Sequence, residues 1–221
     1  METLAFMLHN LPAIGQRTVE HLSIVSVAVG VAVLTGVPLG IAITQSKRAA
    51  DTVLYLGSIV MTIPSIALFG VLIPLLSKIG QGIGYLPAVI AAMLYAQLPI
   101  VRNTYTAIRN VDPALRSAAT GMGMSALQRL MRVEIPIALP VIIAGIRVAV
   151  VINIGVTAIA AYIGAGGLGT FISRGISQTD VRQLLTGALT LALLAIACDY
   201  SLLWLQRRLT PKGAQPRVAR T

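Results

Sequence analysis

Long stretches with few or no charged residues constrain this chain more than any other feature. Five stretches qualify: residues 22–43, 55–77, 79–101, 135–164 and 184–205. The first three hold no Asp, Glu, Lys or Arg, and the last two hold one each, Arg147 and Asp199. A helix needs about 20 apolar residues to cross the hydrocarbon core of a bilayer. None of the stretches has the polar face of a surface helix in a soluble protein. We therefore expect an all-α, polytopic integral membrane protein with five transmembrane helices.

The basic residues predict the orientation of these helices. The chain holds 17 Lys and Arg against seven Asp and Glu, although only 11% of its residues are charged and 56% are hydrophobic. With five crossings, twelve of the 17 lie on one side of the membrane: in the connection between the first two stretches, in 102–134 or after 205. Four lie on the opposite side, and Arg147 lies inside a stretch. Lys and Arg collect in cytoplasmic segments. We expect the inner membrane, an outer N-terminus and a cytoplasmic C-terminus. Lipid headgroups account for the charge, and we expect no nucleic-acid partner.

The remaining segments predict no second domain and no enzyme. Residues 1–21 are too polar to span, so we expect them to form either an interfacial helix or a mobile lead-in. We expect a single transmembrane domain over residues 1–208. Residues 209–221 hold Pro and Gly and are expected to be a disordered tail. Cys198 is the single cysteine, which excludes a disulfide framework. No cluster of residues suggests a catalytic or metal site.

Prolines and polar residues inside the stretches suggest a translocation path. Pro64 lies near the middle of 55–77, where it removes a backbone donor and kinks a helix. Interrupted helices form substrate sites in transporters, although proline is also simply tolerated in membrane helices. Asn153 needs a polar partner inside the membrane. The candidate path residues are Pro64, Ser65, Asn153 and Thr157; for the small residues around Asn153, close helix packing is the alternative.

The two intramembrane charges predict an ion pair. Arg147 lies 11 residues after Pro136, and Asp199 lies eight residues before Arg207. At about 1.5 Å per residue, both are at a similar depth from the same face. An intramembrane charge needs compensation. We expect Arg147 to pair with Asp199 between the fourth and fifth helices; the alternative is that Arg147 faces an aqueous path.

Residues 102–134 are too structured to be a simple connection. Asp112 followed by Pro113 is typical of an N-cap and a first helical residue, so we expect a short helix over 113–120, ended by Gly121 and Gly123. Ser125 with Gln128 forms a capping-box pattern, which predicts a second helix over 126–134. Two short helices joined by a glycine hinge indicate a docking site for a cytoplasmic partner.

The same loop resembles a known family. The run from Ser117 to Gly123, with Val-Glu-Ile-Pro following nine residues later, resembles the EAA loop of binding-protein-dependent ABC importer permeases. Ala118, Ala119, Gly123 and Pro136 match its pattern, and Ser117 stands where the family has Glu. The resemblance implies a MetI-like permease fold in which this loop sits in a groove of an ATPase. The implied coupling residues are Asp112, Pro113, Ser117, Ala118, Ala119, Gly121 and Gly123.

Residues 62–65, 136–147 and 161–169 further resemble the branch that imports quaternary ammonium osmoprotectants such as glycine betaine, choline and carnitine. The resemblance implies a second permease chain (a copy or a paralogue), two ATPase subunits and an extracytoplasmic substrate-binding protein. ATP and Mg²⁺ would be bound by the ATPase, with no cofactor and no catalytic residue in this chain. The alternatives are a permease for another small solute such as methionine, or an ATP-independent channel or carrier. Residues 164–169 fit GxGxxG, but they follow a membrane helix, which favours a turn re-entering the bundle, or a gate, over a nucleotide site.

Overall fold

The structure, a computed structural model, describes residues 2–210 and is entirely helical there apart from turns and connections, as expected for an all-α protein. The α-helices are α1 (Glu2–His9), α2 (Leu11–Ala42), α3 (Lys47–Thr62), α4 (Ser65–Ser77), α5 (Tyr85–Arg109), α6 (Pro113–Gly121), α7 (Ala126–Arg129), α8 (Ile135–Ala160), α9 (Gly169–Ser177) and α10 (Val181–Leu209). A π-helical turn, Leu130–Glu134, joins α7 to α8. Short 3-10 turns, Ile43–Gln45 and Ala161–Ile163, extend α2 and α8.

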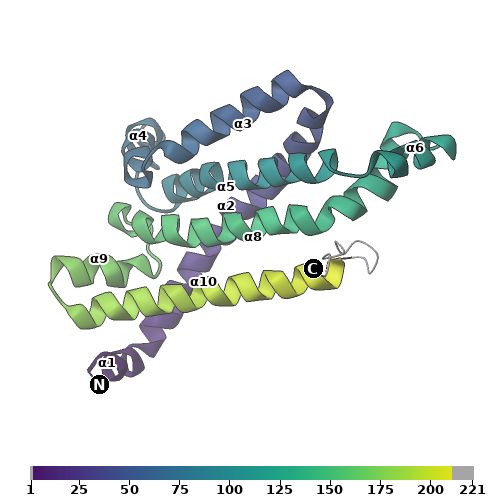
Figure 1. The fold of residues 1–221 in the computed structure, drawn as a ribbon. Coiled ribbons are helices and arrows are strands. Elements are labelled where there is room, and N and C mark those ends of the chain that lie inside the picture. The colour runs from purple at the N-terminus through teal and green to yellow at the C-terminus, as the bar shows by residue number, and fades with distance from the viewer. Residues whose placement is uncertain (1, 211–221) are drawn as a thin grey trace.

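Four helical segments are long and apolar enough to cross a membrane: Leu11–Gln45, Tyr85–Arg109, Ala126–Ile163 and Val181–Leu209. The helices α5, α8 and α10 run nearly side by side, with α2 crossing behind them (Figure 1). The segment α6–α7 lies at one end of this bundle, where α5 ends and α8 begins, and we call this the α6 end. The opposite end carries α1 and α9 and is called the α9 end (Figure 1).

The second expected helix, 55–77, is broken near the expected Pro64, and its two parts together are apolar enough for one broken span or a re-entrant loop. It is a bent pair, with α3 and α4 meeting at 97°. A proline disfavours helical geometry in the residue before it, and Ile63 accordingly has an extended backbone that ends α3 at Thr62. The carbonyl of Ile63 accepts a hydrogen bond from the hydroxyl of Tyr95 on α5. The break at Pro64 is therefore satisfied by a neighbouring helix.

Several expected helix boundaries are also corrected. The helix α5 begins at Tyr85, not at residue 79, because Gly80 and Gly84 adopt left-handed φ angles of 72° and 94° in the turn before it. It then continues to Arg109, which shortens the expected 102–134 loop. The expected lead-in, residues 1–21, is helical where it is described: α1 covers Glu2–His9, and the long helix α2 already begins at Leu11, before the expected residue 22. Helix α9 was not expected, because nine residues with Arg174 among them carry no membrane-span signal.

Small side chains set the spacing of the core. On α5, Ala91, Ala92 and Ala96 are fully buried, as are Ala32 on α2 and Ala149 on α8. Because these side chains end at Cβ, α2 and α8 approach α5 closely from its two sides. Helix α10 packs against α8 and α9 on the outside of the bundle, and its most apolar window has no buried residue. At its far end, α10 extends to Leu209, four residues beyond the expected 205; the rest of the expected tail, 211–221, lies outside the described residues.

Candidate coupling segment and translocation residues

The segment between α5 and α8 is built from locally encoded caps. The Asp112 side chain accepts a hydrogen bond from the Ala114 amide at 2.8 Å, and Pro113 begins α6. Ser125 and Gln128 form a reciprocal capping box, with bonds of 2.9 and 3.3 Å between side chain and backbone. Between the two helices, Gly123 has a left-handed φ of 79°. Both short helices therefore begin where the sequence predicts them, but the second is not a separate helix over 126–134: α7 ends at Arg129 and continues through the π-helical turn Leu130–Glu134 into α8.

Most of the expected coupling residues face solvent in the single chain. Asp112, Pro113, Ser117, Ala118, Gly121 and Gly123 are exposed, whereas Ala119 packs inward at 1% exposure. Four large apolar side chains are exposed beside them: Leu115, Met122, Leu127 and Met131. Exposed apolar side chains gathered on one segment of a structured surface are typical of an interaction site. We call this surface, made by these four side chains around α6 and α7, the coupling surface.

Glu134 joins the helices of the coupling surface through ion pairs, and this role was not predicted from the sequence. Its carboxylate is only 6% exposed and lies 3.0 Å from Nε of Arg129 and 3.4 Å from Nε of Arg116. Arg129 also donates to the Thr120 hydroxyl, and Arg116 donates to the backbone carbonyl of Ile108 on α5. One buried acid therefore ties α6, α7 and the end of α5 to the start of α8. The available signal was composition, because Glu134 and Asp112 are the only acids in 102–134.

The four candidate path residues do not share one exposed surface. Pro64 is exposed and Ser65 half-buried at the break between α3 and α4. Asn153 and Thr157 lie one turn apart on α8 and are buried, at 0% and 1% exposure. The Asn153 amide donates to the Ala149 carbonyl at 2.9 Å, while Asn153 Oδ1 and Thr157 Oγ1 have no partner among the described residues. Asn153 therefore lies on an interior surface in the single chain, and its place in a translocation path stays a prediction.

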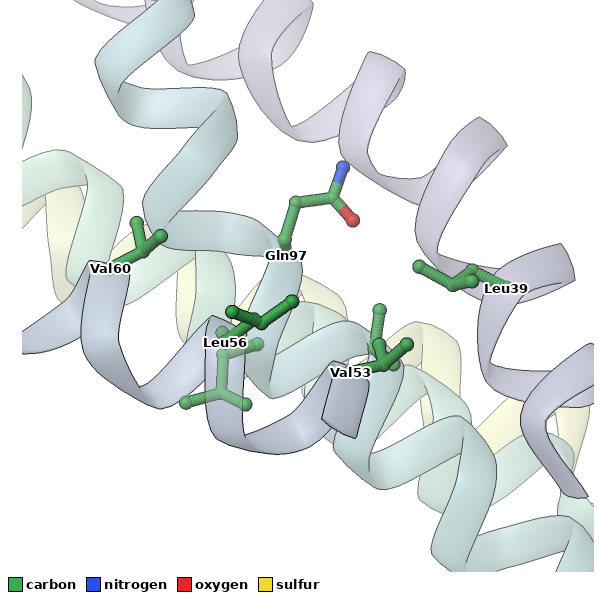
Figure 2. Close-up of a pocket in the computed structure, with 8 residues that line it drawn as sticks. Leu39, Val53, Leu56, Val60 and Gln97 are labelled. Atoms are coloured by element: carbon green, nitrogen blue, oxygen red, sulfur yellow. The ribbon is translucent and has the colours of Figure 1, made fainter. Parts of the chain in front are cut away.

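A mainly apolar cavity of about 200 Å³ opens between α2, α3 and α5 (Figure 2). Leu39, Val53, Leu56 and Val60 line it from α2 and α3, and Gln97 projects into it from α5. The Gln97 amide donates to the Thr35 hydroxyl at 2.7 Å, and its Oε1 has no partner in the described part of the chain. Gln97 is therefore the single polar side chain in an otherwise hydrophobic lining, and its free oxygen is buried against α2.

The expected Arg147–Asp199 pair is present between α8 and α10. Arg147 Nη2 lies 2.8 and 2.9 Å from the two Asp199 carboxylate oxygens, and Nε lies 3.1 Å from Oδ1. The side chains are 21% and 35% exposed. Gln206 extends the network, accepting from Arg147 at 3.0 Å and donating to the Pro140 carbonyl at 2.8 Å. Within residues 2–210, no three His, Cys, Asp or Glu side chains are placed to hold a metal ion.

A bundle of apolar helices with a capped, exposed helix pair at one end is the architecture of a transport permease that is coupled to another protein. Comparison with known families agrees with this class. Residues 36–214 match the family described as the binding-protein-dependent transport system inner membrane component, and the chain belongs to this family. The family places the protein in the inner membrane, in transport systems that depend on a substrate-binding protein.

Curated relatives match nearly the whole chain. It is 56% identical over 213 residues to the osmoprotectant import permease protein OsmW of Salmonella typhimurium, covering 96% of this chain and 99% of the relative. It is 41% identical to the choline transport system permease protein OpuBB of Bacillus subtilis, covering 90% and 89%. It is 39% identical to the glycine betaine/carnitine/choline permease protein OpuCB of the same organism, covering 97% and 96%.

The fold also matches a solved structure. A chain of the inward-facing MetNI methionine ABC transporter superposes with a TM-score of 0.81, covering 90% of this chain and 96% of that chain. The sequence identity is 22%, so this likeness concerns the fold alone. The expected MetI-like permease fold is therefore confirmed.

Proposed function

We propose that this chain forms the translocation path of an ATP-driven importer for a small quaternary ammonium osmoprotectant such as glycine betaine, choline or carnitine. The observation that carries the proposal is the full-length identity of 39–56% to permeases named for osmoprotectant, choline and glycine betaine/carnitine/choline transport. An aromatic cage is the usual binding site for a quaternary ammonium, and this chain has only ten aromatic residues in total. High-affinity recognition is therefore assigned to the binding protein, and the permease supplies a low-affinity path.

The exposed apolar side chains of the coupling surface support the proposal that a partner ATPase binds there. Two ATPase subunits would bind the coupling segments of two permease chains, either two copies of this chain or a copy and a paralogue. In this assembly ATP and Mg²⁺ are held by the ATPase subunits, and this chain carries no cofactor and no catalytic residue. Glu134, at the start of α8, transmits their motion, because it pairs with Arg129 of α7 and with Arg116 of α6, which in turn donates to the Ile108 carbonyl of α5.

The proposed orientation has the α6 end in the cytoplasm and the N-terminus outside. The α6 end carries Lys47, Arg48 and the arginines between Arg102 and Arg132, while the α9 end carries only Arg17, Lys78, Arg174 and Arg182. Basic residues favour the cytoplasmic side of a membrane. In this orientation the coupling surface meets the ATPase and the α9 end meets the binding protein.

The test is uptake by liposomes that hold the permease, its ATPase and its binding protein. Labelled glycine betaine, choline, carnitine and methionine are supplied outside, with ATP or ADP inside. We expect uptake of at least one quaternary ammonium with ATP and none with ADP. Uptake of methionine and of none of the three quaternary ammonium compounds would contradict the osmoprotectant assignment and indicate a methionine permease. Equal uptake with ADP and with ATP would contradict an ATP-driven importer and indicate a channel or carrier.

A further inference from the structure

The glycine-rich turn over residues 164–169 is held by contacts that the proposed function does not use. It joins the end of α8 to the start of α9, at the α9 end of the bundle. Gly164, Gly166 and Gly167 have left-handed φ angles of 77°, 80° and 76°. On one side, the Gly84 amide before α5 donates to the Ile163 carbonyl at 2.8 Å. This backbone bond anchors the start of the turn to α5.

On its other side the turn is held by a single carboxylate of α2. The Gly167 amide donates to Glu20 Oε2 at 3.0 Å, although the two residues are 147 positions apart in sequence. Arg17 donates to the same oxygen at 2.7 Å, and their side chains are 28% and 31% exposed. A Cβ on Gly166 would lie 2.6 Å from this oxygen. The fit is therefore close, but water can reach the bond.

His21, the next residue on α2, lies beneath the turn. It is fully buried, and its Nε2 lies 3.1 Å from the Ile154 carbonyl on α8. A Cβ on Gly167 would lie 3.0 Å from His21 Nδ1, which has no partner among the described residues. Glu20 and His21 therefore contact both α8 and the turn that follows it, and they fix the turn relative to α2.

We propose that Glu20 and His21 are positioning residues for a gate formed by the turn at the extracytoplasmic end of the path. The backbone hydrogen bond between Gly84 and Ile163 stays formed when the gate moves. The partly exposed hydrogen bond between Glu20 and Gly167 is the one that breaks. Breaking that bond frees the turn from α2 when the transporter opens outward. The inference rests on the proposed importer and on its orientation. It deepens them by assigning residues to the outer gate.

A single-cysteine experiment tests this gate. In a Cys198→Ala background, which removes the only cysteine of the chain, Ala165→Cys places a thiol in the turn. The permease–ATPase complex is reconstituted without ATP, and a membrane-impermeant maleimide is added outside. We expect Glu20→Ala to raise the labelling rate about three- to tenfold, the factor that the loss of one hydrogen bond typically gives. Glu20→Gln retains an acceptor oxygen and should fall between Glu20→Ala and the parent.

Gln16→Ala is the matched control, because Gln16 touches Glu20 at 3.3 Å but not the turn. It should label like the parent. If Glu20→Ala does not assemble, Glu20→Gln serves instead, and a smaller increase in the same direction is expected. An unchanged labelling rate in an assembled variant of either kind overturns the gate assignment.

Labelling and uptake separate failure of the gate from failure of the proposed function. The labelling comparison needs no substrate, so it reads the gate even if none of the tested solutes is transported. Reaction only with a maleimide trapped inside overturns the orientation, and with it the extracytoplasmic gate. If labelling rises in Glu20→Ala, ATP-driven uptake should also fall relative to Gln16→Ala; unchanged uptake would mean that the turn moves without gating transport, and would overturn the proposal.

Discussion

Arg147 on α8 and Asp199 on α10 form a bidentate ion pair, with their closest atoms 2.8 Å apart. The pair joins two helices whose paired residues are 52 positions apart in the chain. Gln206 lies about two helical turns after Asp199 on α10 and connects Arg147 to the Pro140 carbonyl. Because α10 otherwise presents an apolar outer surface, this network is its main polar attachment to α8.

Removing one partner of this pair should destabilise the protein more than removing both. We expect Asp199→Ala to lower the free energy of unfolding by about 1.5–3 kcal/mol, because Arg147 then stays charged and poorly compensated. The double variant Arg147→Met with Asp199→Leu should recover much of this loss. The measurement is thermal unfolding of the purified protein in detergent. Equal stability of Asp199→Ala and the parent would show that lipid or water already satisfies Arg147.

The two glycines of the coupling segment provide a matched pair. A Cβ on either Gly121 or Gly123 meets open space, but only Gly123 has a left-handed φ. An L side chain in that conformation costs about 1–2 kcal/mol. We expect the Gly123→Ala turn to relax in the free chain, so that restoring its shape on docking weakens ATPase binding about five- to thirtyfold. Gly121→Ala should bind like the parent. The affinity is measured by titrating the ATPase against the permease in nanodiscs, and equal affinities of the two variants would contradict the expectation.

Glu134→Gln should uncouple ATP hydrolysis from transport. It removes the carboxylate that pairs with Arg116 and Arg129, so the coupling helices lose their charged link to α8. We expect the ATPase still to bind, with substrate uptake reduced per ATP hydrolysed. Asp51→Asn is the control, because Asp51 is an exposed acid near the same end and has no ion pair among the described residues. Unchanged coupling in Glu134→Gln would remove the transmitting role of this acid.

The hydroxyl of Tyr95 should stabilise the break at Pro64. In Tyr95→Phe the Ile63 carbonyl loses its hydrogen-bond donor in an apolar region, which costs about 1–3 kcal/mol. We expect a lower unfolding temperature, with Tyr55→Phe unchanged because Tyr55 is 68% exposed and its hydroxyl has no partner among the described residues. Equal unfolding temperatures for the two variants would show that another group satisfies this carbonyl.

Features that depend on neighbouring residues or on the constant rise of a helix were predictable from the sequence, whereas most other contacts between distant residues were not. Asp112 and Ser125 cap helices through bonds from amides two and three positions away, and Pro113 is the first residue of α6, so this local pattern located α6 and α7. The depth of Arg147 and Asp199 followed from the constant helical rise, and this was enough to pair them. Glu134 was missed because its partners lie on separate helices.

The start of α2 shows the same limit. Arg17, Glu20 and His21 argued against a continuous membrane helix, because polar side chains are unfavourable in such helices. In the structure Glu20 pairs with Arg17 and the Gly167 amide, and His21 bonds the Ile154 carbonyl. These partners lie more than 130 residues away, apart from Arg17, and no local pattern identifies them. The bend at Pro64 was similarly visible as a break, but its 97° angle was not.

The length of α3 has a consequence for the surrounding lipid. Its 16 residues rise roughly 24 Å, whereas the hydrocarbon core is about 30 Å thick. Because α4 turns away at 97°, it adds little height, while the 25 residues of α5 rise roughly 37 Å. We therefore expect the apolar layer beside α3 and α4 to be thinner than the layer beside α5. Lipids with longer acyl chains would increase this hydrophobic mismatch and strain the Pro64 break. The conformation of the break should therefore depend on the thickness of the bilayer.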